Sequence, residues 1–152
     1  MIYAVARDNE FEHLADVIAA DPAALLLLAE RSLAQPEPDA RWQFAARLGT
    51  WVVRRGPAEA LLLRLVDDPD EYVRRRALLS LGKMRSLHAE ALAVRAWDTG
   101  EEYQRIAALW VLKDIASDKL ATYVARAHED GREHVVWNAE QVLLPAEEPG
   151  PD

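Results

Sequence analysis

The chain has 152 residues, 51% of them hydrophobic and 29% charged, a balance typical of one soluble globular domain and unlike that of a disordered segment. The absence of cysteine excludes disulfides, thiolate metal sites and a cysteine nucleophile, and it agrees with a reducing compartment. The net charge of −8 disfavours a surface built to bind nucleic-acid phosphates.

Charge is unevenly distributed along the chain. Residues 1–37 carry a net charge of −5, whereas residues 39–55 and 70–85 each carry +3. We interpret the two basic stretches as solvated helix faces; the alternative is a basic strip that meets an acidic partner. No apolar run is long enough to span a membrane, and the N-terminal segment becomes acidic too early for a secretory signal. We therefore expect a cytoplasmic protein without membrane contact.

The first part of the chain predicts three helices. Residues 8–20 place apolar side chains at helical spacing, which predicts a helix with one solvated face. Asp21 and Pro22 are typical of an N-cap and a first helical residue, and they open a second helix over residues 22–35. A third apolar helical pattern covers residues 39–55.

The rest of the chain repeats itself at an interval of 31 residues. Residues 67–84 are matched by 98–115 and, more weakly, by 129–146. A shorter helical segment before each of these repeats at the same interval. The recurring positions are an acid at Asp67, Asp98 and Glu129, a small residue at Ala77, Ala108 and Ala139, and a leucine at Leu81, Leu112 and Leu143.

Each repeat predicts a short helix, an acidic turn and a longer helix. Alternation of apolar and polar residues at period two is absent, so we expect no strands. A helix pair of about thirty residues cannot bury its apolar face alone, so successive pairs must stack. We predict a single domain over residues 1–144, with a cap at 8–20, helix pairs at 22–55, 57–84, 87–115 and 118–144, and a flexible acidic tail at 145–152.

The repeat that begins at residue 57 resembles the HEAT repeat, in which a turn aspartate and a valine-arginine pair recur. The residues that carry the resemblance are Asp67, Pro69, Val73, Arg74, Ala77 and Leu81. It implies an all-α, right-handed α-solenoid of about four HEAT-like helix pairs plus an N-terminal capping helix. It also implies that the second helices line the concave face, and that turn aspartates and arginines form a structural ladder between repeats. The ladder residues would be Asp67, Arg74, Asp98 and Arg105.

Bulky side chains occupy equivalent outward positions of the second helices. Aromatic residues and arginine anchor protein interfaces, because they bury a large area for few immobilised torsions. We therefore predict a partner-binding groove on the concave face, and the alternative for any single tryptophan is a gap filler between helices. The predicted groove residues are Trp42, Tyr72, Arg75, Arg76, Leu79, Tyr103, Trp110, Asp114, His134, Trp137 and Gln141.

A local resemblance to one enzyme family is the only indication of catalysis in the sequence. Residues 106–116, with Trp110, resemble a helix of the HEAT-like DNA alkylation repair glycosylases, and Arg76 with Ala77 resembles a pair that this family turns toward DNA. The catalytic Trp-Trp-Asp-x-Val-Asp motif of that family is absent, which leaves Asp114 as the only candidate carboxylate. The histidines are scattered, and no phosphate loop or nucleophile elbow is present. We predict no catalytic residue, no metal site and no cofactor.

The sequence therefore favours a non-catalytic module, monomeric, that binds another protein in its groove. HEAT-like chains that resemble this one act as inhibitors of the immunity type or as assembly scaffolds, and no residue selects between these roles. Two alternatives remain open at this point. One is a DNA-binding relative of the alkylation repair glycosylases, and the other is a lyase-type chaperone of the phycobilin lyase HEAT class.

Overall fold

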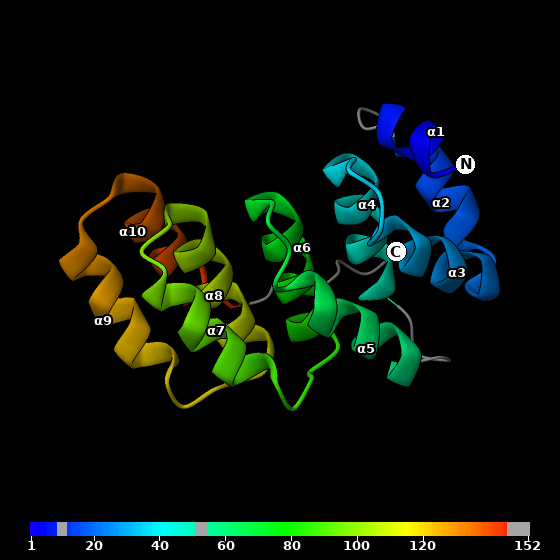
Figure 1. Cartoon of the computed structure of the whole chain (residues 1–152). Coiled ribbons are helices and arrows are strands. Elements are labelled where there is room, and N and C mark those ends of the chain that lie inside the picture. Colours follow the sequence, from blue (N-terminus) through cyan, green and yellow to red (C-terminus); the bar gives the residue numbers. More distant parts are fainter. Residues whose placement is uncertain (9–11, 51–54, 146–152) are drawn as a thin grey trace, which may run out of the picture.

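Helices alternate along the chain in two rows. The computed structural model describes residues 1–8, 12–50 and 55–145, and within these ranges the chain forms α-helices and no strand (Figure 1). The helices are α1 (Ile2–Arg7), α2 (His13–Ala19), α3 (Pro22–Ser32), α4 (Pro38–Leu48), α5 (Arg55–Leu65), α6 (Glu71–Lys83), α7 (Ala89–Asp98), α8 (Glu102–Asp114), α9 (Leu120–Asp130) and α10 (Glu133–Gln141).

The second helices of the repeats form one continuous row. Helix α4 packs on α6, α6 on α8, and α8 on α10, while each also packs on the first helix of its own pair (Figure 1). Within the described residues, α5 and α7 have no comparable packing on each other, and neither do α7 and α9. The result is an all-α solenoid whose second helices present one shared surface, which we call the second-helix face.

Local signals set where the helices begin and end. The Asp21 carboxylate accepts hydrogen bonds from the backbone N–H groups of Ala23 and Ala24, and Asp70 accepts one from Val73 N–H at 3.1 Å. After α6 and α8 the backbone turns through the left-handed region at Arg85 and Ala116. The N–H groups of the next residues then donate back into α6 and α8, to the carbonyls of Leu81 and Leu112.

Small residues allow the second helices to approach closely. Ala77, Ala108 and Ala139 are fully buried, as expected for residues at helix crossings. Gly82 in α6 adds a further close contact, because a Cβ atom built there would lie 2.9 Å from the Val111 Cγ2 atom of α8. Leu143 departs from its repeat partners, since 59% of it is exposed beyond the last helix.

The N-terminal end differs from the expectation of one helix over residues 8–20. Helix α2 begins only at His13, and an additional helix, α1, precedes it. Helix α1 packs on α4, where the buried Gln43 side chain donates a hydrogen bond of 2.8 Å to the Val5 carbonyl. Residues 51–54 at the end of the helix expected over 39–55, and most of the expected tail, residues 146–152, lie outside the described residues.

Candidate functional site

Aromatic rings and guanidinium groups are stacked across the second-helix face. The rings of Trp42 in α4 and Tyr72 in α6 have centroids 5.1 Å apart and are inclined by 60°. The Arg75 guanidinium carbon lies 4.6 Å from the Tyr72 centroid and 4.5 Å from that of Tyr103 in α8. Arg76 lies 5.7 Å from the Trp42 ring and 5.9 Å from the Tyr72 ring. These five residues are called the aromatic–arginine stack.

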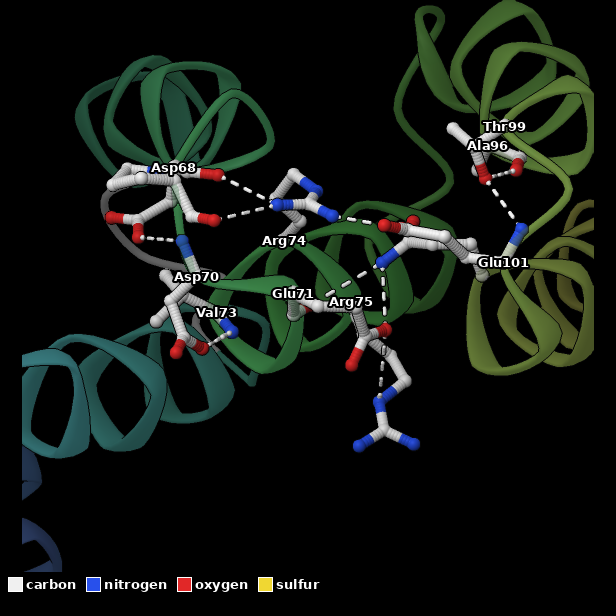
Figure 2. A network of polar contacts seen from close by, with 11 residues as sticks. Asp68, Asp70, Glu71, Val73, Arg74, Arg75, Ala96, Thr99 and Glu101 are labelled. Carbon is white, nitrogen blue, oxygen red and sulfur yellow. Dashed lines mark hydrogen bonds and ion pairs between the residues drawn. The ribbon is translucent and has the colours of Figure 1, made fainter.

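The two arginines of the stack are poor in polar partners. Within the described residues, Arg76 forms no hydrogen bond or ion pair. Arg75 has only its Nε atom 3.7 Å from a carboxylate oxygen of Glu71, beyond hydrogen-bond range, and this buried Nε has no hydrogen-bond partner there. In Figure 2 the terminal nitrogens of Arg75 point away from the neighbouring polar network. Their N–H groups are therefore available to a ligand.

A cavity of about 290 Å³ lies beside the stack, between α6 and α8. Five predicted groove residues line it together with two apolar neighbours on α8. Its wall is partly cationic and partly apolar, which suits a ligand that carries both a negative group and an apolar group. The lining residues are Tyr72, Arg75, Arg76, Leu79, Ile106, Ala107 and Trp110.

Toward the C-terminal end, Trp110 connects α8 to α10. Its indole N–H donates a hydrogen bond of 2.8 Å to the Asn138 side-chain oxygen, and the Asn138 amide donates to the His134 carbonyl. Trp137 is 56% exposed on α10, while Gln141 is half-buried. The second-helix face therefore continues past the cavity with a free indole.

Trp42 and Asp114, two of the predicted groove residues, do not line the cavity. Trp42 is only 6% exposed, because Tyr72 and Arg76 cover it, and it forms the floor of the stack. Asp114 does not line the cavity and is half-buried at the end of α8. Burial raises the pKa of its carboxyl, and the nearby charges of Lys83, Lys113 and Arg85 oppose that rise.

A ladder of arginines joins the repeats along another edge. In each rung, an arginine in the first turn of a second helix reaches an acid where the two helices of the next repeat meet and a backbone carbonyl where those of its own repeat meet. Figure 2 shows the middle rung, with Arg74 between the Asp68 carbonyl and the Glu101 carboxylate. The acidic partners are Asp68 for Arg41, Glu101 for Arg74 and Asp130 for Arg105, and the carbonyls belong to Gln35, Asp68 and Trp97.

The ladder differs from its sequence prediction in its acids. Arg74 and Arg105 lie in it, but Asp67 instead pairs at 2.8 Å with the exposed Arg95, and Asp98 is exposed without a hydrogen bond or ion pair inside the described ranges. Asp67 and Asp98 were predicted because they are 31 residues apart. The acids that form the ladder are not separated by this constant interval. Arg41, which forms the first rung, was not among the predicted ladder residues. Its position in its helix is equivalent to those of Arg74 and Arg105, and this equivalence could have identified it.

Neither a metal centre nor a membrane span emerges from the described part of the chain. No group of three or more histidine and carboxylate side chains there is arranged to hold a metal ion. No helix among these residues combines the length and apolarity needed to cross a bilayer.

Comparison with known proteins agrees with the repeat architecture. The family model for HEAT repeats matches residues 25–113 and, in a second overlapping placement, residues 58–143. Comparison with curated proteins found no match. Because the two placements together span well over half of the chain, the protein belongs to the HEAT repeat family.

Proposed function

We propose that this protein is a non-catalytic binding module that holds a protein partner on its second-helix face. HEAT repeats commonly act as protein-interaction modules, and stacked repeats offer long continuous surfaces for this purpose. The proposal depends on family membership for its class of function and on the surface residues for its location.

The observation that supports this location is the exposure of large aromatic side chains along one row of helices. Tyr72 is 36% exposed, Tyr103 50% and Trp137 56%, and all three lie on second helices. Tyrosine, tryptophan and arginine are enriched at the centres of protein interfaces. Burying them against a partner would remove apolar surface from water at a low cost in side-chain entropy.

A nucleic-acid partner is disfavoured by charge. The chain carries −8 overall, and neutralisation of several phosphates requires a surface with many free cations. A mobility-shift experiment with duplex DNA at about 50 mM salt tests this alternative, because phosphate-driven binding is strongest at low salt. Retardation of the duplex that is lost at higher salt would favour DNA over protein.

Site-specific photo-crosslinking tests the proposed location. A photoreactive amino acid replaces Tyr103 or Trp137 in two variants, and Leu87 in a control, since Leu87 is 98% exposed in the turn before α7. After irradiation in native lysate, we expect the same protein to crosslink from positions 103 and 137 and not from position 87. Crosslinked peptides identified by mass spectrometry locate the contact.

Alanine variants provide the complementary measurement. Tyr103→Ala combined with Trp137→Ala removes two exposed rings without touching the buried core, so the melting temperature should change little. Binding of the crosslinked partner should fall by at least tenfold, as expected for interface anchors. Unchanged binding, or equal crosslinking from Leu87, would remove the second-helix face as the interaction surface.

A further inference from the structure

We infer that the cavity between α6 and α8 binds an acidic side chain of the partner, an aspartate or glutamate next to an apolar residue in one peptide segment. The inference rests on the proposed function, because it names the chemistry of the partner at the same surface. It is carried by the state of Arg75 and Arg76 and by the apolar remainder of the cavity wall.

Arg75 lies beside two tyrosine rings of the second-helix face. The guanidinium carbon of Arg75 lies 4.6 Å from the ring centroid of Tyr72 and 4.5 Å from that of Tyr103, so the two rings flank the group and restrict its movement. A guanidinium edge presents parallel N–H groups that match the two oxygens of a carboxylate. Because the two rings already restrict the group, little side-chain entropy is lost on binding.

The described residues offer the two arginines little negative charge of their own. Glu71 is the carboxylate nearest to Arg75, but the same oxygen accepts a hydrogen bond of 2.9 Å from the Gln104 amide, and its 3.7 Å distance to Arg75 exceeds hydrogen-bond range. Arg76 has no acidic partner among the described residues. Two positively charged guanidinium groups therefore face one cavity, and the nearby Glu71 carboxylate compensates their charge only in part. This local excess of positive charge favours binding of a negatively charged group.

Much of the remaining cavity wall is apolar. Leu79, Ile106 and the Trp110 ring supply apolar surface beside the two cations. A free anion would leave this surface in contact with water, whereas a peptide with adjacent acidic and apolar side chains would cover both parts. A single carboxylate is also repelled less than a polyanion by a chain of charge −8.

Selection from a random peptide display library tests the inference even while the partner is unidentified. The bait is the full chain, either unchanged or carrying Arg75→Gln or Arg76→Gln. The matched control is Arg126→Gln, since Arg126 also lies over a tyrosine, Tyr123, at 5.0 Å, but on α9 and away from the cavity. Melting temperatures of all variants are compared first.

With the unchanged chain and the Arg126→Gln chain, we expect selected peptides to share an acidic residue beside an aliphatic or aromatic one. Replacing that acid by its amide in a selected peptide should weaken binding by about 10-fold to 100-fold. The Arg75→Gln chain should bind the acidic peptide more weakly by the same factor, and it should bind the acidic peptide and its amide equally.

Three results would overturn the inference. They are selected peptides without acids, no selection by the unchanged chain, and tighter competition by inorganic phosphate than by free glutamate for the bound peptide. In each case crosslinking from Tyr103 could still capture the partner, and then the proposed function would stand with a different chemistry. Failure of the crosslinking itself would instead remove the proposed function.

Discussion

Arg41 and Asp68 form a buried ion pair that joins α4 to the turn between α5 and α6. The arginine donates from Nε at 2.6 Å and from Nη2 at 3.1 Å to the two carboxylate oxygens. The side chains are 7% and 5% exposed, so neither charge could be solvated if its partner were removed. The neighbouring Asp67 pairs with Arg95 at 2.8 Å in solvent, where both side chains are more than half exposed.

The first prediction compares these two ion pairs. Arg41→Gln should destabilise the fold by about 3–5 kcal/mol, because it leaves the buried Asp68 carboxylate uncompensated. Arg95→Gln should change stability by less than about 1 kcal/mol, because exposed pairs contribute little. Equilibrium unfolding in urea measures both values. Equal effects of the two substitutions would show that burial does not separate the two pairs.

A second prediction concerns acid sensitivity at the last rung of the ladder. Hydrogen bonds from Arg132, together with one from Arg105, hold the pKa of Asp130 well below its usual range, although burial acts in the opposite direction. Because its pKa is lowered by folding, the ionised Asp130 carboxylate stabilises the folded chain. This stabilisation is complete above the pKa of the unfolded carboxyl, about 3.9, and is lost as the pH falls from there through the folded pKa.

Asp130→Asn should therefore destabilise the chain by about 1–3 kcal/mol at neutral pH, with a smaller difference from the parent at low pH. Urea unfolding across an acidic pH series measures the convergence. Asp98→Asn is the control, since Asp98 is an exposed turn acid for which a change within about 0.5 kcal/mol is expected. A constant difference at all pH values would contradict the assignment.

The fold could be predicted because repetition in the sequence reports repetition in space. The short helix expected before each repeat appears as α5, α7 and α9, and the recurring alanines are buried. The ladder acids could not be chosen in this way, because successive helical residues point about 100° apart and the turn length varies between repeats. A shift by one residue, from Asp67 to Asp68, exchanges an exposed acid for a buried one.

The candidate site was less accessible to sequence reasoning. Equivalent positions on second helices identified four of the five residues of the stack, and Arg76 came from the resemblance to the alkylation repair family. Periodicity does not say which ring covers which. Trp42 is buried because Tyr72 and Arg76, which belong to the next repeat, pack over its ring. The order of such layers depends on side-chain torsions and on neighbours distant in sequence. The role of the set in partner binding stays a prediction.

Overpacking at a helix crossing gives a third prediction. Ala108 is fully buried between the second helices, so Ala108→Phe should destabilise the fold by roughly 1–3 kcal/mol. Ala121→Phe provides the matched control, because Ala121 is exposed on α9 and can accommodate a ring in solvent. Thermal melting distinguishes the two variants. A parent-like melting temperature for Ala108→Phe would mean that the crossing tolerates a large side chain.

A fourth prediction uses two helical glycines as a pair. Alanine is favoured over glycine in helix interiors by about 1 kcal/mol, and the gain is smaller at Gly56 and Gly82, which lie in the first turn of α5 and the last turn of α6. Among the described residues other than its chain neighbours, nothing lies within 4 Å of a Cβ atom at Gly56, but Pro57 follows and disfavours a side chain there, so Gly56→Ala should change stability by less than about 1 kcal/mol. At Gly82 the Cβ atom would lie 3.2 Å from the Val111 Cα atom, so Gly82→Ala should destabilise it by about 1–3 kcal/mol. Urea unfolding should show a clear loss of stability for Gly82→Ala and little change for Gly56→Ala.

The fifth prediction concerns Asp114, whose pKa burial raises despite the nearby Lys83, Lys113 and Arg85. A raised pKa in the folded chain means that the ionised carboxylate opposes folding at neutral pH. Asp114→Asn should therefore increase stability at neutral pH. This advantage should shrink as the pH falls through the folded pKa and vanish below the unfolded value of about 3.9, where the parent carboxyl is also neutral.

Urea unfolding at neutral and acidic pH measures the effect of Asp114→Asn. The control is Asp118→Asn, an exposed position in the turn after α8, for which a change within about 0.5 kcal/mol is expected at either pH. Lower stability of Asp114→Asn at neutral pH would mean that attraction to the three cations outweighs desolvation. In that case the end of α8 would contribute a stabilising charge cluster, and the carboxylate would belong with the structural ion pairs.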